Sequence, residues 1–344
     1  MEAKELLYYW VGLDVGKREF SAAVELGMGD RKLGVGSLPC RKFNHTKKGV
    51  AEFLKWVDKT TGGRPFKVVM EATGHYSVAL CKLLQGKRKG LECSIVNPYL
   101  TSNFLKSLGL PHKTDDGDAR GIARFGMERR PPATPLLPRQ MEEMRELFRQ
   151  RAALVETRSE FKNRAESRVG EVAQALNDEL LETLDEYIAR IEKALEELAG
   201  KIPWMKRQVE LMLSIPGVGA ITAIGLSAEL GDLGLYTRQG ISAASGLAPR
   251  LHESGTSVKA SWIGRRGSRH VRHLLFLSSN QAIRKIPYLN AMYDRLLAKG
   301  KTKMQVKCAC MRVLIQIIRS VVVHERPYSE DFSYKSLEKS LKTA

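Results

Sequence analysis

Four prolines fall within eight consecutive residues, PPATPLLP at 131–138, in a chain of 344 residues. Proline has no backbone N–H to donate and its ring fixes φ, so such a run forms neither a helix nor a central strand. A chain of this length also exceeds what one hydrophobic core usually serves. The sequence therefore predicts a stiff linker at 131–138 that separates a domain at 1–130 from the rest of the chain.

The residues before this linker alternate between strand-like and helix-like segments. Two β-rich runs, 8–15 and 20–26, flank Gly16 and Lys17, which predicts a β-hairpin at the start of the domain. Apolar spacing marks the elements that follow it. We expect a third strand within 32–43, a helix at 47–59, a strand at 66–71, a helix at 76–86 and a strand at 91–96. The predicted domain is an α/β fold that begins with a hairpin.

Beyond the linker the pattern becomes helical. Leucine and isoleucine recur at intervals of three and four residues between 181 and 198, which is typical of a coiled coil or of a helical hairpin within one chain. The two interpretations are equally good for the region 139–203. A second domain is expected at 204–326, rich in Gly, Ala, Ser and Arg and closed by an amphipathic helix at 302–324. A polar tail is expected at 327–344.

The chain is strongly basic. Lys and Arg number 56 against 38 Asp and Glu, which gives a formal net charge of +18. Such a protein usually binds a polyanion, because each Lys or Arg placed on a phosphate releases condensed counterions. A ribosome-associated protein, or one that is merely basic, has the same balance, so the charge favours nucleic acid without deciding the function.

The cysteines and the apolar segments indicate a compartment. The five cysteines have neither a disulfide framework nor the spacing of a zinc site. The first ten residues carry charges where a signal peptide needs an apolar core, and the apolar stretch at 313–323 is too short to span a bilayer. We expect a cytoplasmic protein, associated with the bacterial nucleoid when active and not with a membrane.

Four acidic residues stand where a metal site would need them. Asp14 ends the first predicted strand and Glu71 ends a later one, whereas Asp115 and Asp118 open a predicted helix. Positions i and i+3 share one helix face, so the last two carboxylates can point at one site. Asp116 is rotated by about 100° from that face and is taken as structural.

A carboxylate cluster of this kind suits phosphodiester chemistry. Hard cations such as Mg²⁺ or Mn²⁺ take oxygen ligands, and a metal pair can activate the attacking oxygen and stabilise the leaving one. A single carboxylate at a strand end is more often a turn or helix cap. All four together, in a basic α/β protein, favour a metal-dependent enzyme that acts on nucleic acid.

The C-terminal half contains two segments suited to phosphate binding. Residues 211–223, LMLSIPGVGAITA, resemble a helix-hairpin-helix in which Gly217 and Gly219 would let the backbone approach a phosphate. The alternative is an ordinary turn between packed helices. Residues 240–276 form a cationic segment, for which we predict nucleic-acid contacts by Arg250, Lys259, Arg265, Arg266, Arg269 and Arg272.

The cationic segment also contains several serines, and the residues alone do not choose a nucleophile among them. Ser254 has local arguments in its favour, because it precedes Gly255 and follows Arg250 and His252. A serine needs positive charge nearby to stabilise its alkoxide before it attacks phosphorus.

Taken in order, these motifs resemble a known family. GLDVGK at 12–17, MEATGHY at 70–76 and KTDDGDAR at 113–120 are similar to the DEDD signature of RuvC-like insertion-sequence transposases, the bridge-RNA-guided serine recombinases. GLAPRLHESGTS at 246–257 and GRRGSRHVRHLL at 264–275 look like the C-terminal transposase domain of that family. The pair Asp116–Gly117 is a small departure, since the family usually has a basic or bulky residue after the first Asp of its last motif.

The resemblance implies a fold, a site and partners. The fold would be an RNase H-like (RuvC-like) α/β domain, a helical coiled-coil region and a mainly α transposase domain. Asp14, Glu71, Asp115 and Asp118 would bind Mg²⁺ or Mn²⁺, and Ser254 would be the nucleophile. The partners would be donor and target DNA, a structured noncoding guide RNA, and further copies of the chain as a dimer or a tetramer on DNA.

Two other functions remain open. One is a RuvC-like, structure-specific (Holliday junction) endonuclease that uses the carboxylates and a metal-activated water. The other is a nucleic-acid-binding protein whose α/β domain has no catalytic activity.

Overall fold

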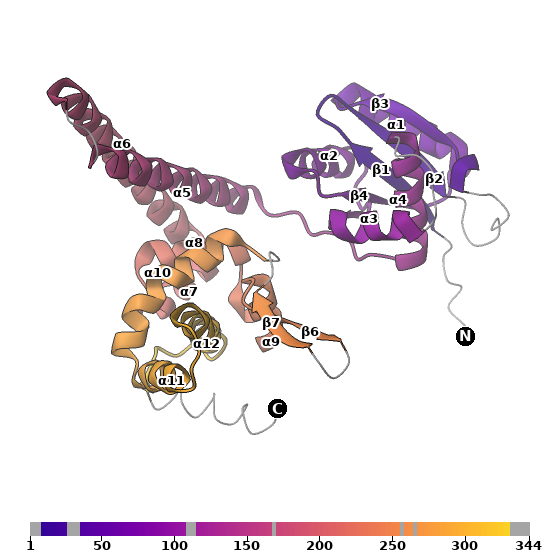
Figure 1. Ribbon diagram of the computed structural model, residues 1–344. Helices are drawn as coiled ribbons and strands as arrows, with labels where there is room; N and C mark the ends of the chain where they lie inside the picture. Colours follow the sequence, from indigo (N-terminus) through magenta and orange to yellow (C-terminus); the bar gives the residue numbers. More distant parts are fainter. Residues whose placement is uncertain are drawn as a thin grey trace. The chain divides into compact units, whose positions relative to one another are not determined.

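The computed structural model describes residues 8–25, 35–107, 115–166, 170–254, 258–263 and 267–330, without the side chains of Asp115 and of 250–263. The chain divides into two compact units, unit 1 up to Leu136 and unit 2 from Leu137 (Figure 1). The division falls inside the proline-rich segment. No helix within the described ranges is long and apolar enough to cross a membrane.

Unit 1 is built on a five-stranded mixed sheet of order β3-β2-β1-β4-β5. Strands β1 (Tyr9–Val15), β2 (Glu19–Glu25) and β3 (Cys40–Asn44) pair antiparallel, whereas β4 (Phe66–Glu71) and β5 (Cys93–Val96) continue from β1 in parallel. The hairpin predicted at Gly16 and Lys17 joins β1 to β2, and the predicted strands are present. The expected segment 32–43 contains most of β3, and its first three residues lie outside the described ranges.

The helices of unit 1 cover both faces of this sheet. Helices α1 (Lys47–Thr61) and α2 (Gly74–Lys87), both predicted, bury their apolar residues against one face, which carries Leu13 and Met70. Helix α4 (Asp115–Arg129) packs on the other face, which carries Trp10 and Val69, together with α3 (Pro98–Ser107), which the sequence patterns did not indicate. A short 3-10 helix, η2 (Val35–Ser37), precedes β3.

The first part of the proline-rich segment is bound to the edge of the sheet. The Thr134 N–H donates to the carbonyl of Cys93 at 2.8 Å, and the Ile95 N–H donates to Thr134 Oγ1 at 2.8 Å. The Ser94 hydroxyl donates to the carbonyl of Pro131 at 3.0 Å. Because an open strand edge invites pairing with other chains, this segment also protects β5.

Unit 2 begins with two long helices, α5 (Arg139–Ala165) and α6 (Glu171–Lys201), which lie side by side (Figure 1). Leu184, Ile188 and Leu195 of the predicted apolar seam are buried in the single chain. Arg151 forms an ion pair with Glu192 across the two helices. The hairpin within one chain, one of the two interpretations of this region, is therefore present.

The remaining elements of unit 2 surround one large core. The amphipathic helix expected at 302–324 is α12 (Lys303–Val323), and a capping box between Thr302 and Gln305 starts it. The two-stranded antiparallel sheet was not predicted. The elements before α12 are α7 (Pro203–Leu213), α8 (Ala220–Leu230), η3 (Leu233–Leu235), α9 (Arg238–Ala244), β6 (Pro249–Ser254), β7 (Val258–Ile263), α10 (Arg269–Lys285) and α11 (Pro287–Ala298).

One glycine sets the distance between α4 and the sheet. A methyl group on Gly12 of β1 would lie 2.1 Å from the backbone nitrogen of Ala123 and 2.3 Å from the carbonyl oxygen of Ala119. The alanines Ala23, Ala119 and Ala123 are fully buried around this contact. The helix backbone therefore rests on the strand backbone.

We predict that Gly12→Ala lowers the free energy of unfolding by at least about 2 kcal/mol, because the helix backbone must move to admit the methyl group. The matched control is Gly86→Ala, in α2, where nothing lies within 4 Å of the added methyl group. It should leave stability unchanged or raise it by up to about 1 kcal/mol. Urea denaturation followed by circular dichroism measures both variants. Equal stability of the two would contradict the close contact.

Candidate active site

Asp14 and Glu71 stand next to each other on the sheet. In the parallel pairing of β1 with β4, Leu13 is opposite Met70, so the next residue of each strand continues the same register. Leu13 and Met70 are fully buried on the face that α1 and α2 cover. Since successive side chains alternate between faces, Asp14 and Glu71 both lie on the face that α4 covers. Both are half-buried.

The close contact at Gly12 carries the first turn of α4 to this same part of the sheet. Ser21 is the register partner of Asp14 in β2, and its hydroxyl donates to Asp116 Oδ1 at 3.4 Å. Asp118 precedes Ala119, one of the residues that rest on Gly12. The helix begins at Asp115, as the sequence predicts.

The donor chemistry of this region suits a hard cation, because it consists of carboxylate oxygens from three elements. The part of the chain that the structure describes contains no group of three His, Cys, Asp or Glu residues arranged to hold a metal ion. The strand register places Asp14 beside Glu71, and the contact at Gly12 places the first turn of α4, which contains Asp118, over the same face of the sheet. The Asp115 side chain lies outside the described residues, so the four-carboxylate site stays a prediction.

Thr101 is a polar neighbour of Glu71 that the sequence did not reveal. Its hydroxyl is fully buried and donates to Glu71 Oε1 at 2.6 Å. The carbonyl of Pro98 lies 3.0 Å from the same hydroxyl, and one hydroxyl proton serves one acceptor at a time. Helix α3 follows β5, so it brings Thr101 to the carboxyl end of the neighbouring strand, β4. The hydroxyl restricts where the Glu71 carboxylate points.

In unit 2, Ser254 is the last residue of β6 and pairs with Val258 across the hairpin. Arg250 and Lys259 belong to β6 and β7. Their side chains, and that of Ser254, are outside the described residues, as are Arg265 and Arg266 altogether. The predicted roles of these residues stay predictions.

The two ends of this hairpin are held together at its base. Gly246 precedes β6 and Gly267 follows β7, and both have a positive φ. A methyl group on Gly267 would lie 2.4 Å from the backbone nitrogen of Gly246. The Ser268 N–H also donates to the carbonyl of Ala244 at 3.2 Å. The backbone segments that precede β6 and follow β7 are therefore in direct contact where the hairpin joins the helices of unit 2.

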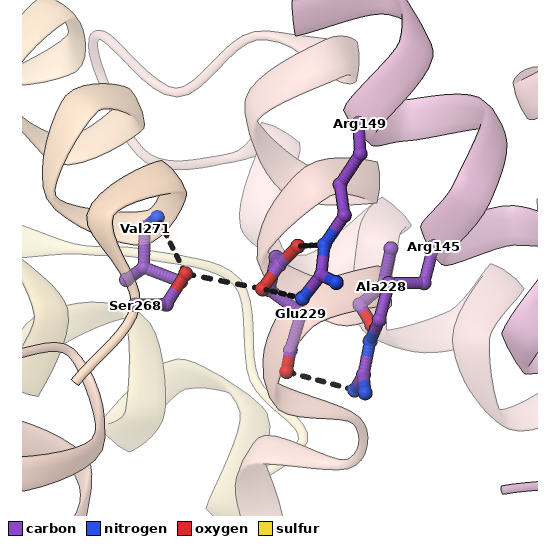
Figure 2. Close-up of polar contacts among 6 residues, drawn as sticks. All are labelled: Arg145, Arg149, Ala228, Glu229, Ser268 and Val271. Atoms are coloured by element: carbon purple, nitrogen blue, oxygen red, sulfur yellow. Dashed lines mark hydrogen bonds and ion pairs between the residues drawn. The ribbon is translucent and has the colours of Figure 1, made fainter. Parts of the chain in front are cut away.

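A buried carboxylate, Glu229 of α8, connects this base to the helices (Figure 2). Arg149 of α5 donates to both oxygens of Glu229, at 2.8 and 3.2 Å. The Ser268 hydroxyl donates to Glu229 Oε2 at 3.0 Å and accepts from the Val271 N–H at 3.3 Å, which caps α10. Arg145 binds the carbonyl oxygens of Ala228 and Glu229.

The network determines the charge of Glu229. Burial by itself raises the pKa of this carboxyl, but hydrogen bonds from Arg149 and Ser268 and the charges of Arg149 and Arg145 outweigh it and lower the pKa. Glu229 is thus ionised at neutral pH and holds the first turn of α10. That turn presents Arg269, which is exposed, and Arg272, which is half-buried.

The comparisons with known proteins match both units. A family model of DEDD transposases of the IS110 type matches residues 11–174, and a second, described as the transposase of the IS116/IS110/IS902 family, matches residues 209–294. The chain contains the transposase domains of this family. It is an enzyme that acts on DNA.

Three relatives of this chain match between 35% and 93% of its length. The pilin gene-inverting protein of Moraxella bovis is 26% identical over 336 residues, which cover 93% of this chain and 98% of the relative. A probable family 20 transposase of Pseudomonas aeruginosa is 24% identical over 64% of this chain and 72% of its own length. The transposase for insertion sequence element IS1111A of Coxiella burnetii is 33% identical over 35% of this chain and 32% of its own length.

The glycine-rich turn of unit 2 lies between α7 and α8. Gly217 has a φ of 90°, and an added methyl group would lie 2.7 Å from the backbone nitrogen of Ala282 and 2.8 Å from the carbonyl of Ser278, both in α10. Gly217 is therefore needed for packing. Gly219 is exposed at the start of α8. Nucleic-acid contact by either glycine stays a prediction.

We predict that Glu229→Gln lowers the free energy of unfolding of the protein at pH 7 by about 2 kcal/mol, the contribution of a hydrogen bond to a charged group. A carboxyl whose pKa is depressed on folding stabilises the fold above its ordinary value of 4.5, and this stabilisation is lost as the pH falls through the folded pKa. The difference between wild type and Glu229→Gln should therefore disappear in acid.

Urea denaturation at pH 7 and at pH 3, followed by circular dichroism, measures this effect. Glu210→Gln is the matched control, because Glu210 is an exposed carboxylate 3.7 Å from Arg207. Such a surface pair contributes less than about 1 kcal/mol. Equal losses of unfolding free energy in the two variants at pH 7 would show that the buried network stabilises the fold no more than a surface ion pair does.

Proposed function

We propose that the chain is the transposase of an insertion sequence that cuts and rejoins DNA through a phosphoserine intermediate. The observation that carries the proposal is the position of the two predicted centres. One is the face of the unit 1 sheet on which Asp14, Glu71 and the start of α4 gather. The other is Ser254, at the end of a strand whose base is held by Glu229 and Gly267. Each lies within one of the two family matches.

The unit 1 sheet supports the RNase H-like, RuvC-like assignment. Its three antiparallel strands start with a hairpin, and two parallel strands follow on the side of β1. In this proposal Asp14, Glu71, Asp115 and Asp118 hold Mg²⁺ or Mn²⁺. When bound, such a cation supplies positive charge at the scissile phosphate. Thr101 orients Glu71 for that role through its 2.6 Å hydrogen bond.

The reaction starts at the serine. Ser254 Oγ attacks phosphorus and loses its proton to solvent or to a nearby base, while the bond from phosphorus to the 3′ oxygen breaks. That oxygen takes up a proton from solvent and leaves as a 3′-hydroxyl, and the DNA 5′ phosphate is then esterified to the serine. The 3′-hydroxyl of the exchanged strand attacks this ester and gives up its proton to solvent, and the serine oxygen leaves and regains a proton. One phosphodiester is lost and one is formed, so no ATP is consumed.

The rejoining step distinguishes this proposal from a Holliday-junction nuclease. A relative that matches 93% of this chain is named for inverting a gene, and an inversion requires that the cut ends be rejoined. A metal-activated water would leave hydrolysed ends, whereas a serine ester retains the bond energy for rejoining. By this argument, rejoining by the relative favours the serine route over the nuclease for this chain.

The net charge of the chain and its exposed residues support three kinds of partner, which are DNA, a guide RNA and further copies of the chain. A net charge of +18 suits a protein that holds both DNA and a structured guide RNA by their backbones while base pairing selects the sequence. Arg269 and Arg272 at the start of α10 belong to this surface in the proposal, together with Arg250, Lys259, Arg265 and Arg266. Exposed apolar residues on α6, Val172, Leu176 and Tyr187, support pairing of two chains, and of two pairs on DNA.

We expect a covalent protein–DNA adduct in cells that carry the whole element, which supplies any guide RNA. Denatured, tagged wild-type protein should retain DNA, whereas Ser254→Ala and Glu71→Gln should retain none. Ser257→Ala, a nearby serine, is the matched control and should keep the adduct. Strand cleavage that persists in Ser254→Ala without any adduct would instead establish a nuclease that uses water.

Thr101→Val should raise the Mg²⁺ concentration needed for half-maximal strand cleavage about tenfold, the usual effect of removing a hydrogen bond to a ligand. Thr101→Ser retains the hydroxyl and should behave as wild type. Valine has nearly the shape of threonine, so the melting temperature of Thr101→Val should stay near that of wild type. An unchanged Mg²⁺ requirement would mean that Thr101 does not position Glu71.

A further inference from the structure

A hollow of about 480 Å³ opens on unit 2 between α10, α11 and α12. Its lining comes from residues 276–307, none of which has a part in the proposed serine and carboxylate chemistry. The volume lies within the range of small-ligand sites, about 300–1,000 Å³. What such a hollow binds depends on the chemistry of its floor and its rim.

The floor is aromatic and apolar. Tyr293 and Phe276 are half-buried, and Met304 is 58% exposed at the edge. The Lys307 ammonium lies 3.3 Å from the centre of the Phe276 ring and donates to Asn280 Oδ1 at 2.5 Å. Burial lowers the pKa of Lys307. Because Lys307 covers the ring of Phe276, Tyr293 and Met304 remain as the surface on which a flat ligand can stack.

The rim is cationic. Arg284 and Lys303 are exposed, and neither has an ion pair or a hydrogen bond from its side chain within the described residues. Lys303 is in the first turn of α12, a helix of 21 residues whose N-terminus adds a partial positive charge. Asp294 is the one acidic residue in the lining. Because positively charged side chains outnumber this one carboxylate in the lining, the hollow favours an anionic group such as a phosphate.

The lining also contains two amide side chains, Asn280 and Asn290, both exposed. Carboxamides present donors and acceptors side by side, which is the pattern on the edge of a nucleobase. A stacking surface, base-edge partners and phosphate-binding cations within one hollow match the three parts of a nucleotide. Bases in a duplex are paired and stacked, so a base must be unpaired to enter such a site.

We propose that this hollow binds one unpaired nucleotide of a single strand. The phosphate lies at Arg284 and Lys303, the base stacks on Tyr293 beside Met304, and Asn280 and Asn290 contact the base edge. The strand is an RNA loop or DNA opened at the site of exchange. The inference depends neither on Ser254 nor on the carboxylates, so it can fail while the proposed function holds.

The test measures binding of short labelled oligothymidylate, oligouridylate and a blunt-ended DNA duplex of two annealed strands to the full-length protein by fluorescence anisotropy. Arg284→Gln/Lys303→Gln should weaken binding of a single strand about tenfold and leave binding of the blunt-ended duplex unchanged. Losing the neutralisation of this one phosphate should also reduce the slope of log K against log salt concentration by about 0.7. The matched control is Lys193→Gln/Lys206→Gln, which removes the same charge from exposed positions on α6 and α7.

A second pair of variants tests the stacking surface itself. Met304→Glu places a carboxylate at the exposed edge of the hollow and should weaken binding of a single strand about tenfold, whereas Met304→Leu should not. A loss seen only with oligouridylate assigns the site to RNA, and a loss seen only with oligothymidylate assigns it to DNA. A loss with both supports a site that accepts either strand. Equal losses for the control variant or for the blunt-ended duplex, or full binding by Met304→Glu, would overturn the proposal.

Discussion

The contact between α4 and Gly12 is the constraint on which the candidate site depends. The helix backbone lies so close to β1 that a single methyl group at Gly12 has no room. This contact fixes the first turn of α4 near the ends of β1 and β4, where Asp14 and Glu71 lie side by side. A larger residue at position 12 would lift the helix, and its carboxylates would move away from those of the strands even if every acidic residue were kept.

In unit 2, a buried ion-pair network positions the residues around the second candidate centre, whereas in unit 1 a close backbone contact does so. The β6–β7 hairpin joins a helical unit at one end only, so that end must be held in place. Here a buried carboxylate, Glu229, holds it. Glu229 is bound by Arg149 from α5 and by Ser268 at the start of α10, so three helices and the base of the hairpin share one ionised group. The neighbouring contact between Gly246 and Gly267 closes the backbone at the same place.

Much of unit 1 could be predicted because its elements have strong local patterns. A few adjacent residues are enough to predict the strands β1 and β2 from their alternation, helix α1 from its apolar spacing, and the start of α4 at Asp115. Thr101 could not be found, since its hydrogen bond to Glu71 joins residues 30 apart. The β6–β7 hairpin was missed as well, because the many glycines and arginines of that segment obscured the alternation of Val258, Ala260 and Trp262. The apolar seam of α6 predicted a helical hairpin within one chain and a coiled coil between two chains equally well. Only the packing of α6 against α5 shows that the hairpin forms.

The central claim is that the carboxylates of β1, β4 and α4 form one cation site in this protein. The measurement that tests it most directly is calorimetric titration of Mn²⁺ into the full-length protein, for wild type, Glu71→Gln and Glu92→Gln. Glu92 is a partly exposed carboxylate that pairs with Lys67, and it is the control for loss of a negative charge. The account predicts that Mn²⁺ binds wild type and Glu92→Gln alike and binds Glu71→Gln at least tenfold more weakly. Equal Mn²⁺ affinity in all three proteins would contradict it.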